Sequence, residues 1–278
     1  MKSFLVAIDF SNCSVNALLH AAQLAYLTES RLEMVWVNNP EKTRANIENL
    51  ASTALIDEMN IQFKRLTDEL HAKYIGLKVD YLIREGKVYK EVGSQALESK
   101  SWLIVAGTHG RSGYEKFWIG CNVYRIVSTA PCPVLTVRSG VDISDQMNTI
   151  ILPIDSTIET REKVTITAEI AMATKAKVIV LKLYSHEMVE VKHVVNVYAD
   201  QVAEYLREKG VEVEMDEMHS TNLTETTIEF AKKVNANLIV IMTEQEKKVA
   251  NFLLGNFAQQ MINHSPVPVL SVHPKEPL

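Results

Sequence analysis

The chain has 278 residues, a formal net charge of −5 and no apolar run that approaches the length of a membrane span. The negative charge argues against a protein that binds nucleic acid through bulk electrostatics. The N-terminal MKSFLVAIDF is too short and too soon acidic for a signal peptide, and the three cysteines are odd in number and show no CxxC or zinc spacing. We therefore expect a cytoplasmic protein with reduced thiols and two domains of roughly 140 residues each.

Apolar runs alternate with helical patterns through the first half of the chain. Continuous apolar character is typical of parallel strands that are buried on both faces. Alternation of strands and helices predicts right-handed crossovers, with helices on both sides of the sheet. The expected strands cover 5–8, 32–37, 78–83, 102–106 and 133–137, and the expected helices follow Ser11 and cover 43–74, 88–99 and 117–129.

The second half repeats this pattern. An Ile-Asp pair ends the first strand of each half, at Asp9 and Asp155, and Gly255 lies 135 residues after Gly120, just as the second Pro-x-Pro-Val motif lies 135 residues after the first. A repeat of this length indicates a duplicated domain. We expect one domain over 1–140 and another over 147–278, with the boundary in the polar segment SGVDISDQMN. The expected strands of the second half cover 150–154, 177–183, 211–215, 238–242 and 268–272.

Glycines gather directly after the fourth strand of the first half, in GTHGRSGYEKFWIGCN. Ligands of open parallel sheets bind outside the carboxyl ends of the strands. Glycine lets a ligand approach the backbone closely, and a turn followed by a helix N-terminus suits an anion such as phosphate. The stretch is neither a Walker A loop nor a dinucleotide fingerprint, and ordinary turn glycines are the alternative interpretation. His109, Arg111 and Lys116 stand in the same loop, where they either meet a phosphate or are solvated.

The combination of Ile-Asp, a Gly107-x2-Gly110-x9-Gly120 spacing and a final Pro-x-Pro-Val strand resembles the universal stress protein family over the whole chain, as a tandem of two domains. The resemblance implies two doubly wound, parallel five-stranded sheets of the Rossmann-like, adenine-nucleotide alpha-hydrolase-like class, related by a pseudo-two-fold axis. It also implies that the protein binds ATP or a related adenine nucleotide, with slow or no hydrolysis.

Carried over residue by residue, the resemblance implies a nucleotide site in the first half. Its adenine-binding positions are Ala7, Asp9 and Val37, and the three glycines of the spacing would meet the phosphates. Cys121 stands where nucleotide-binding members have Ser or Thr, and a thiol is the poorer hydrogen-bond donor. Asn122, the next residue, can supply an amide instead. Any Mg²⁺ would come with the nucleotide phosphates, because no residues at metal-ligand spacing accompany His109. For Asp9, helix capping is the competing interpretation.

The second half lacks the glycines of this loop. Met242 and Gln245 replace Gly107 and Gly110, and Glu244 and Glu246 place negative charge where a phosphate would lie. We therefore expect one nucleotide per chain, a capping role for Asp155 and a second half retained for packing. Two alternatives remain open: a slow ATP hydrolase that uses the same pocket, and a nucleotide-free interaction module, which the Cys121 replacement favours.

Each half closes with an apolar Pro-x-Pro-Val strand, and an uncovered apolar edge strand promotes aggregation. The resemblance implies that such strands pair in dimers of the family. We expect the two strands of this chain to pair with each other, so that one chain mimics a dimer of single domains, with a further homodimer as an open alternative.

Overall fold

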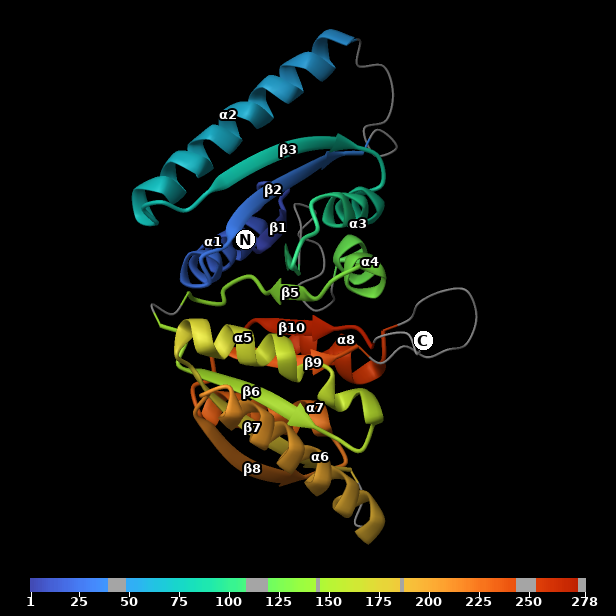
Figure 1. The fold of residues 1–278 in the computed structure, drawn as a ribbon. Coiled ribbons are helices and arrows are strands. Elements are labelled where there is room, and N and C mark those ends of the chain that lie inside the picture. The colour runs from blue at the N-terminus through green and yellow to red at the C-terminus, as the bar shows by residue number, and fades with distance from the viewer. Residues whose placement is uncertain (40–48, 109–119, 144–145, 186–187, 244–253, 275–278) are drawn as a thin grey trace.

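The computed structural model describes residues 1–39, 49–108, 120–143, 146–185, 188–243 and 254–274, and it confirms the predicted alternation of strands and helices (Figure 1). The elements of the first half are β1 (Ser3–Ala7), α1 (Asn12–Leu27), β2 (Arg31–Asn38), α2 (Asn49–Lys73), β3 (Val79–Glu85), α3 (Val88–Glu98), β4 (Leu103–Gly107), α4 (Cys121–Thr129) and β5 (Val134–Val137).

The second half follows the same order, with one short additional helix. Its elements are β6 (Thr149–Ile154), the 3-10 helix η1 (Ile158–Arg161), α5 (Val164–Thr174), β7 (Lys177–Tyr184), α6 (Val189–Glu208), β8 (Val213–His219), α7 (Leu223–Lys233), β9 (Leu238–Met242), α8 (Asn256–His264) and β10 (Val269–Val272).

The two expected five-stranded parallel sheets are present, and they join edge to edge into one sheet. The order is β3-β2-β1-β4-β5-β10-β9-β6-β7-β8, so each half reads in the same way from its outer edge to the centre. Neighbouring strands within each half are parallel, whereas β5 and β10 pair antiparallel, with Leu135 opposite Leu270. Figure 1 shows these two strands side by side in the middle of the molecule.

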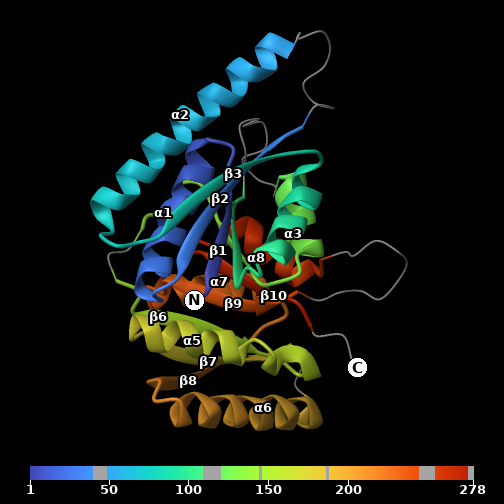
Figure 2. The same ribbon diagram turned by 45° about the horizontal axis from the view of Figure 1, so that its top comes forward.

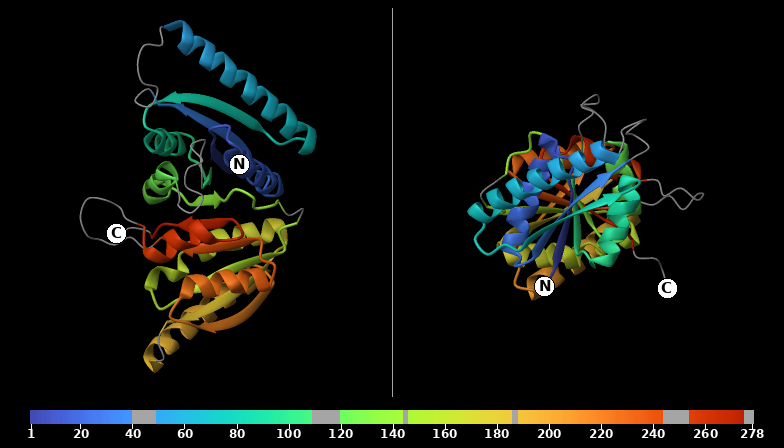
Figure 3. Two further views of the ribbon diagram at one scale, coloured as in Figure 1. Left: turned by 180° about the vertical axis from the view of Figure 1, so that it is seen from behind. Right: turned by 90° about the horizontal axis from the view of Figure 1, so that it is seen from above.

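The helices cover the sheet in two layers, one on each face (Figures 2 and 3). One apolar cluster packs α1, α2, α5 and α6 against the sheet, and the other packs α3, α4, α7 and α8. Successive residues of a strand point to opposite faces, so Phe4 and Val6 belong to the first cluster and Leu5 to the second. This burial on both faces explains the continuous apolar runs of the sequence.

Several boundaries differ from the sequence-based expectation. The strand expected at 211–215 runs instead over Val213–His219, because Gly210 takes a φ of +78° and the Val211 amide donates to the Leu206 carbonyl (3.0 Å) to end α6. As an outermost strand, β8 tolerates acidic residues that no buried strand would accept. The helices expected over 43–74 and 117–129 are described from Asn49 and from Cys121, and the residues before these lie outside the described part, apart from Gly120, which caps α4.

Two equivalent side chains cross between the halves beside the central strand pair. Arg138 follows β5 and donates from Nη1 to the Ser265 carbonyl at the end of α8 (3.3 Å). His273, which lies 135 residues later and follows β10, contacts the Val127 carbonyl of α4 through Nε2 (2.6 Å). Burial lowers the pKa of His273. One side chain of each half therefore hydrogen-bonds to a backbone carbonyl in or at the end of the last helix of the other half.

Candidate functional site

The carboxyl ends of β1, β2 and β4 lie together at one edge of the first half. Ala7, the last residue of β1, is paired in register with Val35 of β2 and Ala106 of β4. Val37 and Gly107 continue the same two neighbouring strands by one or two residues. Ala7 and Val37 are partly buried against the apolar cluster beneath α3 and α4. The structure thus brings the predicted residues Ala7, Val37 and Gly107 to the edge where ligands of parallel sheets bind.

Asp9 lies in the tight turn between β1 and α1. Its Oδ1 accepts a hydrogen bond from the Ser11 amide (3.0 Å), and its own amide donates to Ser14 Oγ (3.2 Å). Ser11 caps α1 by accepting from the Ser14 amide (3.2 Å). Phe10 between them takes a φ of +59°, which is uncommon for a bulky residue. Helix capping was the alternative role for Asp9, but Ser11 is the residue that caps α1. Asp9 instead accepts from the Ser11 amide within the preceding turn, which fixes its carboxylate at the strand end.

Gly107 has a packing role that the sequence did not reveal. A Cβ atom at this position would lie 2.8 Å from the backbone carbonyl carbon and oxygen of Cys13, and 2.9 Å from its Sγ. The first turn of α1 therefore approaches β4 more closely than any side chain at 107 would permit. No sequence pattern could indicate this contact, because it joins two elements that are far apart in the chain.

Gly120 is the N-cap of α4, with a φ of −59°, and its amide donates to the Thr108 carbonyl (2.9 Å). A Cβ here would lie 3.3 Å from that same carbonyl oxygen. The first turn of any α-helix leaves amide groups without intrahelical acceptors, and the helix dipole adds partial positive charge there. In α4 that turn carries Cys121, which is exposed, and Asn122, which is half-buried. The arrangement suits an anion. His109, Gly110 and Arg111 lie outside the described residues.

The equivalent edge of the second half is built differently. The helix η1 takes the place of the first turn of α1: it begins three residues after Asp155, as α1 begins three residues after Asp9, and α5 starts only at Val164. Asp155 Oδ1 accepts from the Thr157 amide (2.8 Å), which confirms the same turn-forming geometry as at Asp9. Met242 replaces Gly107 and is buried in the cluster beneath α5 and α6. This later helix start removes the close contact that requires glycine in the first half.

A buried lysine lies beneath this turn. Lys163 is 2% exposed, and its Nζ donates to the Thr160 carbonyl (2.7 Å) and to Thr160 Oγ1 (3.1 Å). Burial lowers its pKa to about 8, and the nearby Asp155 carboxylate partly opposes that shift. Asp155 and Lys163 lie 146 residues after Asp9 and Ala17, so alanine occupies the matching position of the first half. Lys163 was not predicted as a buried charged residue, although a lysine within an apolar helix pattern was a visible signal.

Among the residues that the structure describes, no cluster of three or more His, Cys, Asp or Glu side chains is placed to hold a metal ion. The described helices include none that is long and apolar enough to cross a membrane.

The fold defines a tandem α/β protein whose two parallel sheets have the same strand order. The model of the universal stress protein family matches residues 1–138 and 147–273, so the chain belongs to that family. A universal stress protein of Methanocaldococcus jannaschii is 27% identical over 141 residues, which is 49% of this chain and 82% of that protein. One from Thermus aquaticus is 26% identical over 141 residues, 49% of this chain and 98% of the relative.

A solved structure extends the likeness to the whole chain. The crystal structure of a universal stress protein from Archaeoglobus fulgidus superposes with a TM-score of 0.76 at 16% identity, covering 98% of both chains. At this identity the likeness concerns the fold, and it confirms the tandem arrangement expected from the sequence repeat.

Gly107→Ala tests the packing role of this glycine in the absence of any ligand. We expect it to lower the free energy of unfolding by about 1–3 kcal/mol, because the new methyl group meets the Cys13 backbone, which cannot move without α1. Gly120→Ala should cost less than about 1 kcal/mol, because its contact is longer and its φ suits any residue. Urea unfolding of the nucleotide-free proteins measures both. Equal losses, or a larger loss for Gly120→Ala, would contradict the packing account.

Lys163 should make stability depend on pH in the alkaline range. The pKa in the folded state is about 8, below the ordinary 10.5, so the unfolded chain binds the proton more readily and the lysine costs stability at neutral pH. That cost shrinks as the pH rises from 8 towards 10.5. Relative to Lys163→Met, the parent should gain about 2 kcal/mol between pH 7 and 9.5, at about 1.4 kcal/mol per unit of pKa.

Chemical unfolding of both proteins across this pH range gives the difference directly. Lys233→Met, which removes an exposed lysine from α7, is the matched control and should follow the parent. A constant difference between the parent and Lys163→Met would show that the amine is not held in a buried site.

Proposed function

We propose that the chain binds one adenine nucleotide, ATP or a close relative, at the carboxyl edge of its first half, and acts as a binding or regulatory protein of the stress response. The second half does not bind a nucleotide and serves as its packing partner. The observation that carries this proposal is the contrast between the two edges. In the first half Gly107 ends β4 and Gly120 precedes α4 at this edge, whereas in the second half Met242 takes the place of Gly107 and Glu244 and Glu246 follow it in the sequence.

The roles of the residues follow from their places. The phosphates would lie against the first turn of α4, where amide groups and the helix dipole favour negative charge. Gly107, Gly110 and Gly120 belong to the loop that leads from β4 to this turn, where they would let the phosphates approach the backbone. His109 and Arg111 would add positive charge from the same loop. Cys121 is exposed at this turn, and Asn122 supplies an amide in place of the hydroxyl that nucleotide-binding relatives have there.

The base and ribose would lie towards the ends of β1 and β2. Ala7 and Val37 offer a small, partly apolar surface, and the Asp9 carboxylate offers an acceptor whose orientation is fixed by the Ser11 amide. Mg²⁺, if present, would be held by the phosphates, since the described residues offer no cluster of metal ligands.

The pairing of the two halves belongs to the same proposal. The β5–β10 ladder would let one chain do what a dimer of single domains does, by covering both apolar edge strands. The half-buried His273 and Arg138 contacts would keep the halves together while nucleotide binds and leaves.

A pair of matched variants tests the site. Calorimetric titration of the parent with MgATP should give one site per chain. Asp9→Asn keeps an oxygen to accept from the Ser11 amide but removes the charge, and we expect it to weaken binding about tenfold, or about 1.4 kcal/mol. Asp155→Asn makes the same change in the same turn of the second half and should leave the affinity unchanged.

Two sites in the parent, or no binding at all, would refute the proposal. So would a loss of affinity in Asp155→Asn as large as that in Asp9→Asn. Unfolding curves of both variants, recorded without nucleotide, separate a loss of binding from a loss of folding.

A further inference from the structure

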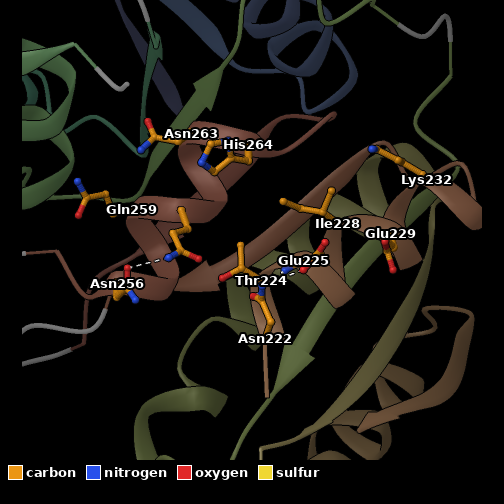
Figure 4. Close-up of a pocket in the computed structure, with 11 residues that line it drawn as sticks. Asn222, Thr224, Glu225, Ile228, Glu229, Lys232, Asn256, Gln259, Asn263 and His264 are labelled. Atoms are coloured by element: carbon orange, nitrogen blue, oxygen red, sulfur yellow. Dashed lines mark hydrogen bonds between the residues drawn. The ribbon is translucent and has the colours of Figure 1, made fainter. Parts of the chain in front are cut away.

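A groove of about 680 Å³ lies between α7 and α8 on the second half, away from the nucleotide edge (Figure 4). Ile228 of α7 lies at its floor, and most of its other lining side chains are polar. The groove contains none of the residues assigned to nucleotide binding. Its volume is within the range of sites that hold small ligands or short peptides.

The α8 wall of the groove is built from carboxamides. Asn256, Gln259, Gln260 and Asn263 follow one another at helical spacing, so they lie on the same face of α8. Asn256 Oδ1 accepts from Gln260 Nε2 (3.0 Å), and Asn263 is buried at 5% exposure. Figure 4 shows Asn256, Gln259 and Asn263 along this helix, with Gln259 and Asn263 on its side away from α7.

The matching helix pair of the first half is bridged. The Arg125 guanidinium of α4 lies over the Tyr89 ring of α3, 5.2 Å from its centroid, and Tyr124 Oη accepts from the Leu254 amide of the other half (3.2 Å). The residues 135 positions later are Gln260, Thr224 and Gln259. Because Thr224 and Gln260 are shorter, α7 and α8 lack this aromatic–cation bridge, and the space between them remains open.

The lining chemistry favours a peptide backbone over other ligands. A carboxamide offers both an acceptor oxygen and donor hydrogens, the same groups that a peptide unit presents. Glu225 and Glu229 outnumber the single lysine of the lining, Lys232 in the last turn of α7, so the groove disfavours phosphate, and His264 of α8 completes the polar lining. The described lining contains no Phe, Tyr or Trp on which a sugar ring could stack. The two carboxylates, one turn apart, instead complement a basic side chain, and Asn222 Nδ2 holds Glu225 in place (2.9 Å).

We propose that the α7–α8 groove binds an extended, basic polypeptide segment of a partner protein, with the accessible α8 carboxamides of Asn256, Gln259 and Gln260 pairing with its backbone amides and Glu225 and Glu229 facing its basic side chain. The second half then has a binding function of its own. Its helices α7 and α8 are not bridged as α3 and α4 are in the first half, and the groove between them becomes the recognition site. The ligand approaches α8 from the side of α7, so the central strand pair is undisturbed.

Side-chain amide resonances give a direct readout on the full chain. We would label the protein with ¹⁵N and titrate it with acetyl-Gly-Ala-Lys-Ala-Gly-amide. We expect saturable shifts of the side-chain NH₂ signals of Asn256, Gln259 and Gln260. The same peptide methylated on its backbone nitrogens should bind at least fivefold more weakly, because it has lost its amide donors. Maltopentaose and inorganic phosphate, the sugar and anion probes, should leave these signals unmoved.

A double variant, the closing variant, copies the Tyr89–Arg125 bridge of the first half into α7 and α8. Thr224→Tyr combined with Gln260→Arg should fill the groove and weaken peptide binding at least tenfold. Lys233→Tyr adds the same ring to α7 outside the groove and should bind like the parent. Backbone amide spectra show whether each variant is folded.

Absence of saturable shifts in the parent would overturn the proposal. Equal binding of the methylated peptide, undiminished binding in the closing variant, or saturable shifts with maltopentaose or phosphate alone would do so as well. Because none of these measurements involves ATP, their outcome is independent of the nucleotide proposal.

Discussion

The antiparallel ladder between β5 and β10 is the interaction on which the rest of the molecule depends. Each strand is short, apolar and buried, and each would be an exposed sheet edge without the other. Their pairing converts two parallel sheets into one of ten strands, and it sets α4 of one half against the segment after β10 of the other. The antiparallel direction also imposes the pseudo-two-fold relation, since parallel edge strands would have placed both halves the same way up.

Within this symmetric frame the two halves use equivalent positions differently. At the strand-end edge, α1 begins early and packs so closely on β4 that only glycine fits at 107, whereas in the second half η1 takes the place of that first turn and Met242 replaces the glycine. The outer helix pairs differ as well, because Tyr89 and Arg125 bridge α3 and α4 while α7 and α8 leave a groove. Such divergence is what duplication permits, since one copy is free to lose what the other retains.

Much of the architecture could be predicted from the sequence, because its determinants are local. Apolar runs marked nearly every strand, and the 135-residue spacing of Gly120 and Gly255 marked the repeat. What the sequence concealed depends on contacts between distant segments. Gly107 was interpreted as part of a ligand-binding loop, yet its close contact with the Cys13 backbone is by itself enough to require glycine there. The helix η1 and the buried Lys163 were missed because a short 3-10 turn has no apolar period and a lysine is ordinarily exposed. The late start of β8 followed from the turn at Gly210.

Hydrogen exchange of the intact chain tests the central strand pair most directly. An edge strand leaves alternate amides without a partner, whereas an interior strand protects them all. The outermost strands β3 and β8 are internal controls, because each is paired on one side only. The account predicts that the amides of Val134–Val137 and Val269–Val272 are protected as uniformly as those of β1 and β6. Rapid exchange of alternate amides in these two segments, at the rates found in β3 and β8, would contradict it.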